Sequence, residues 1–281
     1  MIRLNGREVA DEILEDLKKR TETLKNKGIE PKLAILRVGQ REDDLAYERG
    51  ILKRFEVTST AVDVKVLDEN VSQEELDKTF DGLNSDPKVH GILVFRPLPG
   101  ELSDEHMKKT IDPGKDVDFM DVRNMGDVLA GVRGCSAPCT AEAVMEMIRH
   151  YKIETKGKKV TVVGRSLVIG KPVALLLTTA NATVTVCHTK TQNVAEECKR
   201  ADIIIACCGV AKIISERYVK PDQVVIDVGM NVDDDGKLCG DVDYEKVSGI
   251  VGAVSPVPGG VGSITTAILL KHVIINAERQ V

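Results

Sequence analysis

The residues best placed to do chemistry form a glycine-rich turn between a predicted strand at 159–163 and a predicted helix at 170–178. The turn runs Gly164-Arg165-Ser166-Leu167-Val168-Ile169-Gly170-Lys171-Pro172. Glycine lets a ligand approach the backbone closely, and proline near the first helical position suits an exposed helix N-terminus that can receive an anion. The turn therefore favours a phosphate-bearing cofactor over a plain strand-to-helix connection.

Three common motifs nearly fit this turn, and each fails on its chemistry. A P-loop has four residues between its first Gly and Gly-Lys, followed by a hydroxyl for magnesium; here five residues intervene and Pro172 has no hydroxyl. A nucleophile elbow needs Gly two residues after Ser166, where Val168 stands. The ordinary dinucleotide fingerprint needs Gly at Ser166 itself, so that match is irregular.

The next predicted strand, 183–187, bears on the choice of cofactor. NAD sites usually place an acid at the end of this strand, about 20 residues after the glycines. Here the strand ends Cys187-His188-Thr189-Lys190, and no acid follows before Glu196. Hydroxyl and cationic donors suit a ribose phosphate, so the sequence favours NADP, with NAD as the alternative. We interpret His188 as a hydrogen-bonded turn residue rather than a catalytic acid or base.

Two candidate metal sites fail on ligand chemistry. Asn231-x-Asp233-x-Asp235-Gly236 begins like a calcium loop, but its twelfth position is Val242 rather than Glu, so we expect a solvated turn. Cys207 and Cys208 are neighbours on a predicted strand and would point to opposite faces, which prevents joint ligation of one metal. We therefore expect no metal.

Composition limits the remaining classes of function. A chain of 281 residues with 42% hydrophobic content suggests about two domains with real cores. The net charge of −5 and the absence of Trp leave no basic footprint or stacking platform for nucleic acid. Seven Cys without a Cys-x-x-Cys pair, and an N-terminus without an apolar signal core, predict a reduced, cytoplasmic protein. The uncharged stretch 247–270 is rich in Gly and Pro, so we expect a buried strand and a loop there and no membrane span.

Apolar spacing predicts the elements that position these residues. In the first run, a helix begins after an N-cap at Asn5 and ends at Gly28, and two further helices are expected at 43–57 and 72–83. The strands of this run are expected at 32–38, 61–67 and 91–94. The second run is helices 141–151, 170–178 and 193–200, and strands 159–163, 183–187, 203–207 and 224–228. A final helix at about 264–277 has no partner in sequence and is expected to pack on the first domain. The alternation predicts an α/β fold with parallel sheets and right-handed crossovers.

Several segments together resemble the methylenetetrahydrofolate dehydrogenase/cyclohydrolase family, in the family's order and across nearly the whole chain. They are Gly91-Ile92-Leu93-Val94 with Pro97-Leu98-Pro99, Lys115-Asp116-Val117-Asp118, Pro138-Cys139-Thr140, Gly164-Arg165-Ser166 with Val168, Gly170 and Pro172, Cys187-His188-Thr189-Lys190-Thr191, Asp227-Val228-Gly229 with Asn231, Gly240-Asp241-Val242, and Pro256-Val257-Pro258-Gly259-Gly260-Val261-Gly262.

The resemblance implies a folate-binding catalytic domain at 1–138 with 264–281, and a Rossmann-type, doubly wound NAD(P) domain at 139–263, with a cleft between them and a homodimer as the usual assembly. It implies hydride transfer from 5,10-methylenetetrahydrofolate to NADP, giving 5,10-methenyltetrahydrofolate, in one-carbon metabolism and purine biosynthesis. Folate nitrogen lone pairs stabilise the cation left by the hydride, so the protein mainly aligns donor and acceptor. Most members then hydrolyse the product to 10-formyltetrahydrofolate.

The resemblance also implies the site residues. For folate they are Tyr47, Val94, Pro97, Leu98, Asp118, Pro258, Gly259 and Gly260, of which Tyr47 and Asp118 are the catalytic candidates. For the cofactor they are Thr140, Gly164, Arg165, Ser166, Val168, Gly170, Pro172, His188, Thr189, Cys208, Gly209, Asp227, Gly229, Gly262 and Thr265.

Two positions depart from the family where its members assist ring opening. The family usually has Tyr, three residues, then Lys after a Val-Gly turn; Tyr47 matches, but Ile51 stands at the Lys position. Phe95 stands where the family usually has Gln. Ring opening needs a positioned base, so we predict a dehydrogenase with weak or absent cyclohydrolase activity. Phe119 replaces a Gly, and Ser263-Ile264 replaces Pro-Met, which alters the folate site further.

Two alternatives stay open. One is a fully bifunctional enzyme in which Arg49, Lys53 or Arg96 stands in for the missing Lys. Arg49 and Arg96 would stay protonated and are poor bases, and Lys53 lies about 240° around a helix from Tyr47. Both facts argue against the bifunctional alternative. The other alternative is a non-catalytic protein that binds folate or NADP.

Overall fold

The computed structural model describes residues 1–132 and 134–280, and its contacts divide the chain into two compact units. Met1–Asp11 and Asp127–Thr265 form the unit that we call the six-stranded unit. Glu12–Gly126 and the chain from Thr266 onward form the three-stranded unit. These boundaries differ from the expected ones, because residues 1–11 and 127–138 cluster with the later part of the chain. The assignment of folate and cofactor to separate domains stays a prediction.

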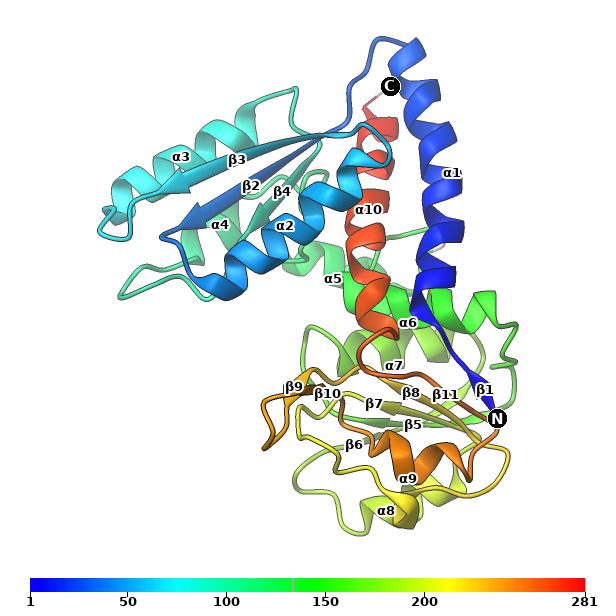
Figure 1. Ribbon diagram of the computed structural model, residues 1–281. Helices are drawn as coiled ribbons and strands as arrows, with labels where there is room; N and C mark the ends of the chain where they lie inside the picture. The colour runs from blue at the N-terminus through cyan, green and yellow to red at the C-terminus, as the bar shows by residue number, and fades with distance from the viewer. Residues whose placement is uncertain (133, 281) are drawn as a thin grey trace. The chain divides into compact units, whose positions relative to one another are not determined.

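Three parallel strands form the sheet of the three-stranded unit. They are β2 (Lys32–Val38), β3 (Ala61–Leu67) and β4 (Gly91–Val94), in the order β3-β2-β4 (Figure 1). The helices are α2 (Glu42–Glu56), α3 (Gln73–Ser85), α4 (Glu105–Thr110), most of α1 (Gly6–Asn26) and α10 (Thr265–Arg279), and the first part of α5 (Val122–Ala130). Phe80 of α3 and Met107 of α4 share a core with Leu36 on one face of the sheet. Side chains alternate along a strand, so Arg37 points to the other face, where it pairs with Glu48 of α2.

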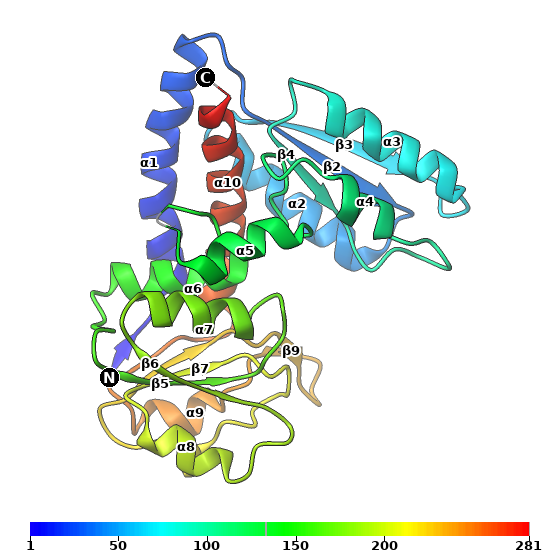
Figure 2. The ribbon, with the colours of Figure 1, turned by 180° about the vertical axis from the view of Figure 1, so that it is seen from behind.

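Helices α1 and α10 lie side by side in both ribbon views (Figures 1 and 2). Arg20 joins them through two hydrogen bonds, from Nε to Glu278 Oε1 at 2.9 Å and from Nη2 to Glu278 Oε2 at 2.6 Å. Helix α10 also reaches β4, because a Cβ placed on Gly91 would lie 2.8 Å from Val273. The C-terminal helix thus contributes to the core of the unit that contains β2 and β4.

Six strands of the described residues form the other sheet, and all neighbours run parallel. In spatial order they are β1 (Ile2–Arg3), β11 (Ala253–Val254), β8 (Val224–Asp227), β7 (Ile203–Ala206), β5 (Lys159–Val163) and β6 (Thr183–Cys187). One face is covered by α6 (Cys139–His150) and α7 (Gly170–Thr179), and the other by α8 (Val194–Arg200) and α9 (Tyr244–Ser248), as Figures 1 and 2 show. Cys198, Ile204 and Val247 belong to the core on the second face.

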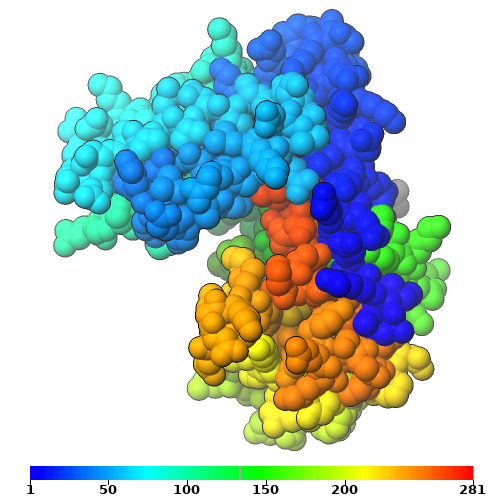
Figure 3. All heavy atoms as spheres, in the orientation of Figure 1, coloured from blue at the N-terminus to red at the C-terminus, as the bar shows by residue number. Residues whose placement is uncertain are grey.

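Short elements complete the six-stranded unit. They are η1 (Glu216–Tyr218), η2 (Val261–Ser263) and an antiparallel hairpin of β9 (Asn231–Val232) and β10 (Leu238–Cys239), which lies on the surface (Figure 3). Asp233 accepts a hydrogen bond from Lys237 N at 2.9 Å and pairs with Lys212 at 2.8 Å, so the acidic run forms a turn. Over residues 1–132 and 134–280, no group of three or more His, Cys, Asp or Glu is arranged to hold a metal ion.

The α/β class and the parallel sheets are confirmed, and the predicted strands 32–38, 61–67, 91–94, 159–163 and 183–187 are observed at those bounds. Two expectations need correction. Strand β7 ends at Ala206, so Cys207 and Cys208 follow the strand instead of lying on it. The stretch 247–270 contains the end of α9, β11, η2 and the start of α10, rather than only a strand and a loop. Among the described helices, none has the length and apolar character to cross a membrane.

Candidate functional site

Close backbone packing shapes the turn after β5. Gly164 has φ of 135°, and a Cβ there would lie 2.2 Å from the carbonyl oxygen of Cys207. A Cβ on Gly170 would lie 2.3 Å from the carbonyl oxygen of Gly164. Only glycine fits at either position, so the first turn of α7 lies directly against the end of β5.

The rest of this turn faces solvent. Arg165, Ser166 and Val168 are exposed, whereas Pro172 is buried in the first turn of α7. The Ser166 hydroxyl accepts a hydrogen bond from the backbone N–H of Ile169 at 3.1 Å. An arginine beside the first amides of a helix attracts anions, so this turn can hold a phosphate group.

The other predicted cofactor residues of the sheet lie at one edge. His188 and Thr189 follow β6, and Cys208 and Gly209 follow β7. Asp227 is the last residue of β8, and Gly229 follows that strand. Strand β5 pairs with β6 on one side and β7 on the other, which places the reversal of strand order beside Gly164. Ligands of open α/β sheets bind outside the carboxyl ends of the strands at such a reversal.

His188 has the contacts of a turn residue, as the sequence predicted. Its backbone N–H donates to the Thr191 hydroxyl at 2.9 Å, and its Nδ1 accepts from the backbone N–H of Lys190 at 3.1 Å. Thr189 and Lys190 are exposed. The end of β6 therefore presents a hydroxyl and an ammonium group, the donors that suit a ribose phosphate.

A carboxylate that sequence reasoning missed anchors the loop after β7. Asp241 accepts hydrogen bonds from the backbone N–H groups of Cys208, Gly209 and Val210 at 2.6, 3.0 and 3.0 Å. Gly229 passes so close that a Cβ there would lie 2.2 Å from the Asp241 carboxylate. The three amides lie 31 to 33 residues from Asp241 along the chain, so its place in a family segment was the one available signal.

Asp227, a predicted cofactor contact, is buried, and backbone groups occupy both carboxylate oxygens. Oδ1 accepts from Gly229 N at 2.9 Å and from Asp241 N at 3.0 Å, and Oδ2 accepts from Val242 N at 2.9 Å. Burial raises the pKa of Asp227 to about 7, although the three amides favour the ionised form. The observed role of Asp227 is to hold the loops at this edge, and a direct cofactor contact stays a prediction.

The segment before α10 carries more predicted residues of this unit. The carbonyl of Gly259, where φ is 100°, accepts from Gly6 N at 2.8 Å, and a Cβ on Gly6 would lie 1.9 Å from the carbonyl oxygen of Gly260. The Thr265 hydroxyl donates to the Gly262 carbonyl at 3.1 Å. Pro258 is exposed, and η2 packs against α6, the helix of Thr140. The start of α1 thus packs closely against this segment.

In the three-stranded unit, Tyr47 of α2 lies against Phe95, the residue after β4. Their ring centroids are 5.6 Å apart and their planes meet at 32°. Ile51, one helical turn after Tyr47, is completely buried, and Phe95 is 6% exposed. Lys53 is exposed. Ile51 and Phe95, the two predicted departures from the family pattern, are therefore both shielded from solvent.

A buried ion pair joins β2 to α2 next to Tyr47. Arg37 Nε donates to Glu48 Oε2 at 2.9 Å, and the side chains are 6% and 14% exposed. Arg37 also donates to the carbonyl of Gly39. Sequence reasoning missed this pair because nothing in the apolar run 32–38 identifies the partner of a charged residue within it.

Asp118 lies beside Arg96. Arg96 Nη2 donates to Asp118 Oδ2, and Arg96 Nη1 donates to Asp104 Oδ2 at 3.3 Å. Burial raises the pKa of the Asp118 carboxyl, and the charge of Arg96 opposes that rise. Val94, Pro97 and Leu98 flank Arg96 in sequence, so the structure brings Asp118 to this predicted folate segment. The other predicted folate residues, Pro258, Gly259 and Gly260, belong to the six-stranded unit.

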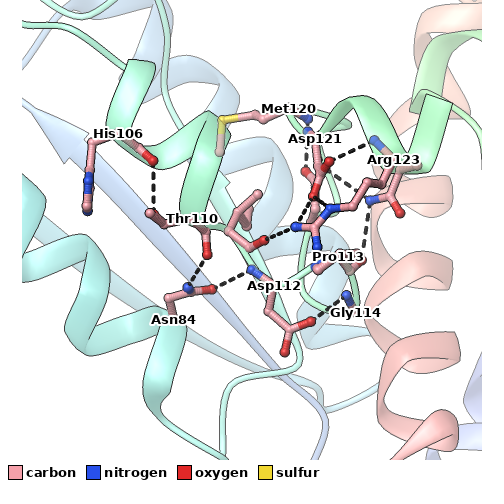
Figure 4. Close-up of polar contacts among 12 residues, drawn as sticks. Asn84, His106, Thr110, Asp112, Pro113, Gly114, Met120, Asp121 and Arg123 are labelled. Carbon is pink, nitrogen blue, oxygen red and sulfur yellow. Dashed lines mark hydrogen bonds and ion pairs between the residues drawn. The ribbon is translucent and has the colours of Figure 1, made fainter. Parts of the chain in front are cut away.

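Polar contacts fix the loop that carries Asp118. Asp116 accepts from the backbone N–H of Asp118 at 3.3 Å and of Asp121 at 2.9 Å. Figure 4 shows a neighbouring contact, in which Arg123 Nε donates to Asp121 at 2.7 Å. Arg123 Nη2 donates to the carbonyl of Ile111 at 3.1 Å. The loop therefore holds Asp118 through its backbone as well as through Arg96.

Phe119, the predicted replacement of a family glycine, has a left-handed backbone, with φ of 56°. This conformation is rare for a bulky residue. The Phe119 ring lies 5.7 Å from the ring of His272 on α10. Phe119 thus places an aromatic side chain in this left-handed turn, directly after Asp118.

Two family models match the chain. The model described as "Tetrahydrofolate dehydrogenase/cyclohydrolase, catalytic domain" matches residues 4–118, and the model described as "Tetrahydrofolate dehydrogenase/cyclohydrolase, NAD(P)-binding domain" matches residues 138–281. Together they cover most of the sequence.

Curated relatives and solved structures agree with these models. "Bifunctional protein FolD" of Clostridioides difficile (strain 630) is 49% identical over 277 residues, which is 99% of this chain and 96% of the relative. The bifunctional FolD crystal structure from Campylobacter jejuni has a TM-score of 0.96 at 37% identity and covers 100% of both chains. The Trypanosoma brucei FolD structure, complexed with NADP and an inhibitor, has a TM-score of 0.92 at 33% identity, with 99% and 98% of the chains covered.

Proposed function

The chain belongs to the tetrahydrofolate dehydrogenase/cyclohydrolase family, and we propose that it oxidises 5,10-methylenetetrahydrofolate to 5,10-methenyltetrahydrofolate with NADP as the hydride acceptor. The observation that carries the proposal is the glycine-lined turn after β5, beside the reversal of strand order. A methylene carbon between two folate nitrogens gives up hydride readily, so alignment is the main requirement.

The chain offers fitting groups for NADP. Gly164 and Gly170 leave room that a Cβ would fill, which lets a pyrophosphate approach the backbone. We assign the ribose phosphate to Arg165, Ser166 and Thr189, which are all exposed. Bound NADP would supply the ring that accepts hydride. The solved Trypanosoma brucei relative contains NADP, which supports this choice over NAD.

For the folate we assign Tyr47 to the reacting end and Asp118 to the pterin. Tyr47 is partly exposed and is backed by Phe95, so its ring can contact a ligand while one side stays packed. The Asp118 carboxylate pairs with Arg96, and Asp116 accepts a hydrogen bond from the backbone N–H of Asp118. Folate contacts of Pro258, Gly259 and Gly260 stay predictions from the resemblance.

The cyclohydrolase step has two readings. The printed names of the relatives, "Bifunctional protein FolD", favour a fully bifunctional enzyme. Against that reading, this chain has a buried Ile51 and a buried Phe95 where ring opening needs a base and a polar group. We propose weak or absent cyclohydrolase activity in this chain, with full bifunctionality as the alternative that the relatives support.

One assay tests these proposals together. The purified chain is mixed with methylenetetrahydrofolate and either NADP or NAD, and the absorbance of the methenyl product and of the reduced nicotinamide is followed. We expect both signals to rise together with NADP and the methenyl signal to decay at the buffer rate. A rapid enzymatic loss of methenyl signal would establish the bifunctional alternative. Binding of both ligands without any reduced nicotinamide would establish a non-catalytic binding protein.

The predictions of a homodimer, a cytoplasmic location and a role in purine biosynthesis remain proposals for this chain. Sedimentation of the purified protein at several concentrations tests the dimer directly.

A further inference from the structure

Arg96 lies between two carboxylates and keeps donors that the protein does not use. Its Nη2 donates to Asp118 and its Nη1 to Asp104 at 3.3 Å. Among the described residues, no other group accepts a hydrogen bond from this guanidinium, so its remaining N–H groups are available to a ligand. The side chain is 30% exposed, which makes those groups accessible.

Asp118 keeps a complementary acceptor. Arg96 engages its Oδ2, while its Oδ1 accepts no hydrogen bond from any residue that the structure describes. The Asp118 side chain is 34% exposed. Arg96 and Asp118 therefore present free donors and a free acceptor side by side, at the end of β4.

Neighbouring contacts hold the pair in this geometry. Lys108 pairs with Asp104 at 2.7 Å, and Asp104 accepts from Arg96 on its other oxygen. Lys108 and Arg96 lower the pKa of Asp104, so its carboxylate stays ionised and stays paired with Arg96. Asp116 fixes the backbone of Asp118. A ligand therefore meets a pair that is already oriented.

The 2-amino-4-oxo edge of a pterin has the complementary order of groups: two donors, the 2-amino group and N3–H, followed by the acceptor O4. We propose that Arg96 is a specificity-determining residue that donates to O4 of the pterin, while Asp118 accepts from the 2-amino group and N3–H. This inference rests on the proposed function, because it requires a folate in the three-stranded unit.

The arrangement discriminates against folates that carry a 4-amino group. A 4-amino ring turns donor hydrogens toward the Arg96 guanidinium and has no N3–H. Arg96 therefore loses its hydrogen bond to O4, and Asp118 loses its hydrogen bond from N3–H. Hydrogen bonds to charged groups contribute about 1.5–3 kcal/mol, so the wrong substituent weakens binding by about tenfold or more. Sites built on a substrate hydrogen bond reject analogues that lack it far better than sites built on apolar contact.

The test compares two folates that differ only in 4-oxo against 4-amino, at a pH where both rings are neutral. Dissociation constants are measured by calorimetry for wild type, Arg96→Leu, Arg96→Lys and Asp118→Asn. We expect wild type to prefer the 4-oxo ligand by about tenfold or more and Arg96→Leu to lower that preference by about tenfold, because the hydrogen bond from Arg96 to O4 is absent. Arg96→Lys should restore part of the preference. Asp118→Asn should weaken the 4-oxo ligand more than the 4-amino ligand, because only the 4-oxo ring carries the N3–H that Asp118 accepts.

The control is Lys109→Leu, which removes an exposed cation of α4 and should leave the preference unchanged. An unchanged preference in a folded Arg96→Leu variant, shown by an unaltered melting temperature, would overturn the role of Arg96 and leave the proposed function standing. A wild-type chain that binds neither ligand would instead overturn the proposed function, and this inference with it.

Discussion

The ring of Tyr47 lies 5.6 Å from the ring of Phe95, and the two planes meet at 32°. Phe95 thereby gives Tyr47 an apolar neighbour, and Ile51 is fully buried one helical turn further along α2. The resemblance predicts that other members of the family carry an amide at the position of Phe95 and an amine at the position of Ile51. The proposed loss of ring opening is therefore a property of two side chains, and substitution can test it.

Installing both polar groups should create or raise cyclohydrolase activity. In Ile51→Lys/Phe95→Gln, a buried Lys would have a lowered pKa, because burial disfavours its charged form, and could then act as a base. A positioned base contributes about 100-fold or more, so we expect methenyltetrahydrofolate hydrolysis to exceed wild type by at least about tenfold after losses in packing.

The matched control for that variant is Ile51→Met/Phe95→Leu, which changes the packing without adding polar groups. It should hydrolyse the methenyl compound no faster than wild type. The loss of methenyl absorbance measures both variants, and an increase of equal size in the two would contradict the proposal.

Removing one partner of the Arg37–Glu48 pair should destabilise the three-stranded unit. Glu48→Ala leaves the Arg37 guanidinium in a site where its side chain is 6% exposed. Breaking a buried ion pair costs about 3–5 kcal/mol, because the remaining charge stays desolvated. Urea unfolding followed by circular dichroism measures the change.

The companion variant Arg37→Met/Glu48→Leu removes both charges and keeps apolar bulk. It should lose much less stability than Glu48→Ala, since replacing a buried pair by apolar residues is often close to neutral. Equal losses in the two variants would show that the pair contributes through packing rather than through charge.

Much of the sheet framework could be predicted from local sequence. Runs such as 159–163 and 183–187 are rich in β-branched residues and are bounded by turns, so strands were predicted there at the observed bounds. Strands β1 and β11 have only two residues each, and they exist because Ile2 and Ala253 pair across most of the chain length. No local pattern indicates such a pairing.

In the candidate site too, local sequence predicts some residues, whereas others depend on contacts between distant parts of the chain. Gly164 and Gly170 can be recognised in the sequence because glycines between a predicted strand and a predicted helix indicate a close backbone approach, which the structure shows. The sequence does not single out Asp241, and it offers Arg96 only as a substitute for the missing Lys, because both residues act on partners that only the folded chain brings close. Resemblance to a family identified positions such as Asp118, but it could not show that Arg96 would occupy one of the Asp118 oxygens.

Gly164→Ala should weaken cofactor binding and stability together. The added Cβ would lie 2.2 Å from the carbonyl oxygen of Cys207 and would also meet a positive φ, so the turn and the end of β7 must separate. We expect the dissociation constant for NADP to rise by about tenfold or more, because the displaced backbone would lose at least one hydrogen bond to the charged pyrophosphate.

Gly236→Ala is the control that separates the clash of an added Cβ from the cost of a left-handed backbone. Gly236 has φ of 75°, but no atom lies within 4 Å of its added Cβ. This variant should lose only about 1–2 kcal/mol for the left-handed conformation and should bind NADP as wild type does. Titration calorimetry decides, and normal NADP affinity in Gly164→Ala would show that the turn does not hold the cofactor.

Asp227 should make the stability of the six-stranded unit depend on pH. Its folded pKa of about 7 lies above the ordinary value of 3.8, because the carboxyl is buried. The folded state therefore binds a proton that the unfolded state releases between these two values. The contribution of Asp227 is complete below about pH 4, is lost as the pH rises toward about 7, and amounts to roughly 4 kcal/mol.

The free energy of unfolding measured at intervals across this range tests the prediction by its slope. Asp227→Asn carries no titratable group, so its stability should vary less with pH than that of wild type, whatever its absolute value. Lys246 supplies the control, because Lys246→Gln removes a charge from an exposed part of the same unit and should leave the slope in place. Parallel pH profiles for wild type and Asp227→Asn would show that the three backbone amides keep Asp227 ionised throughout.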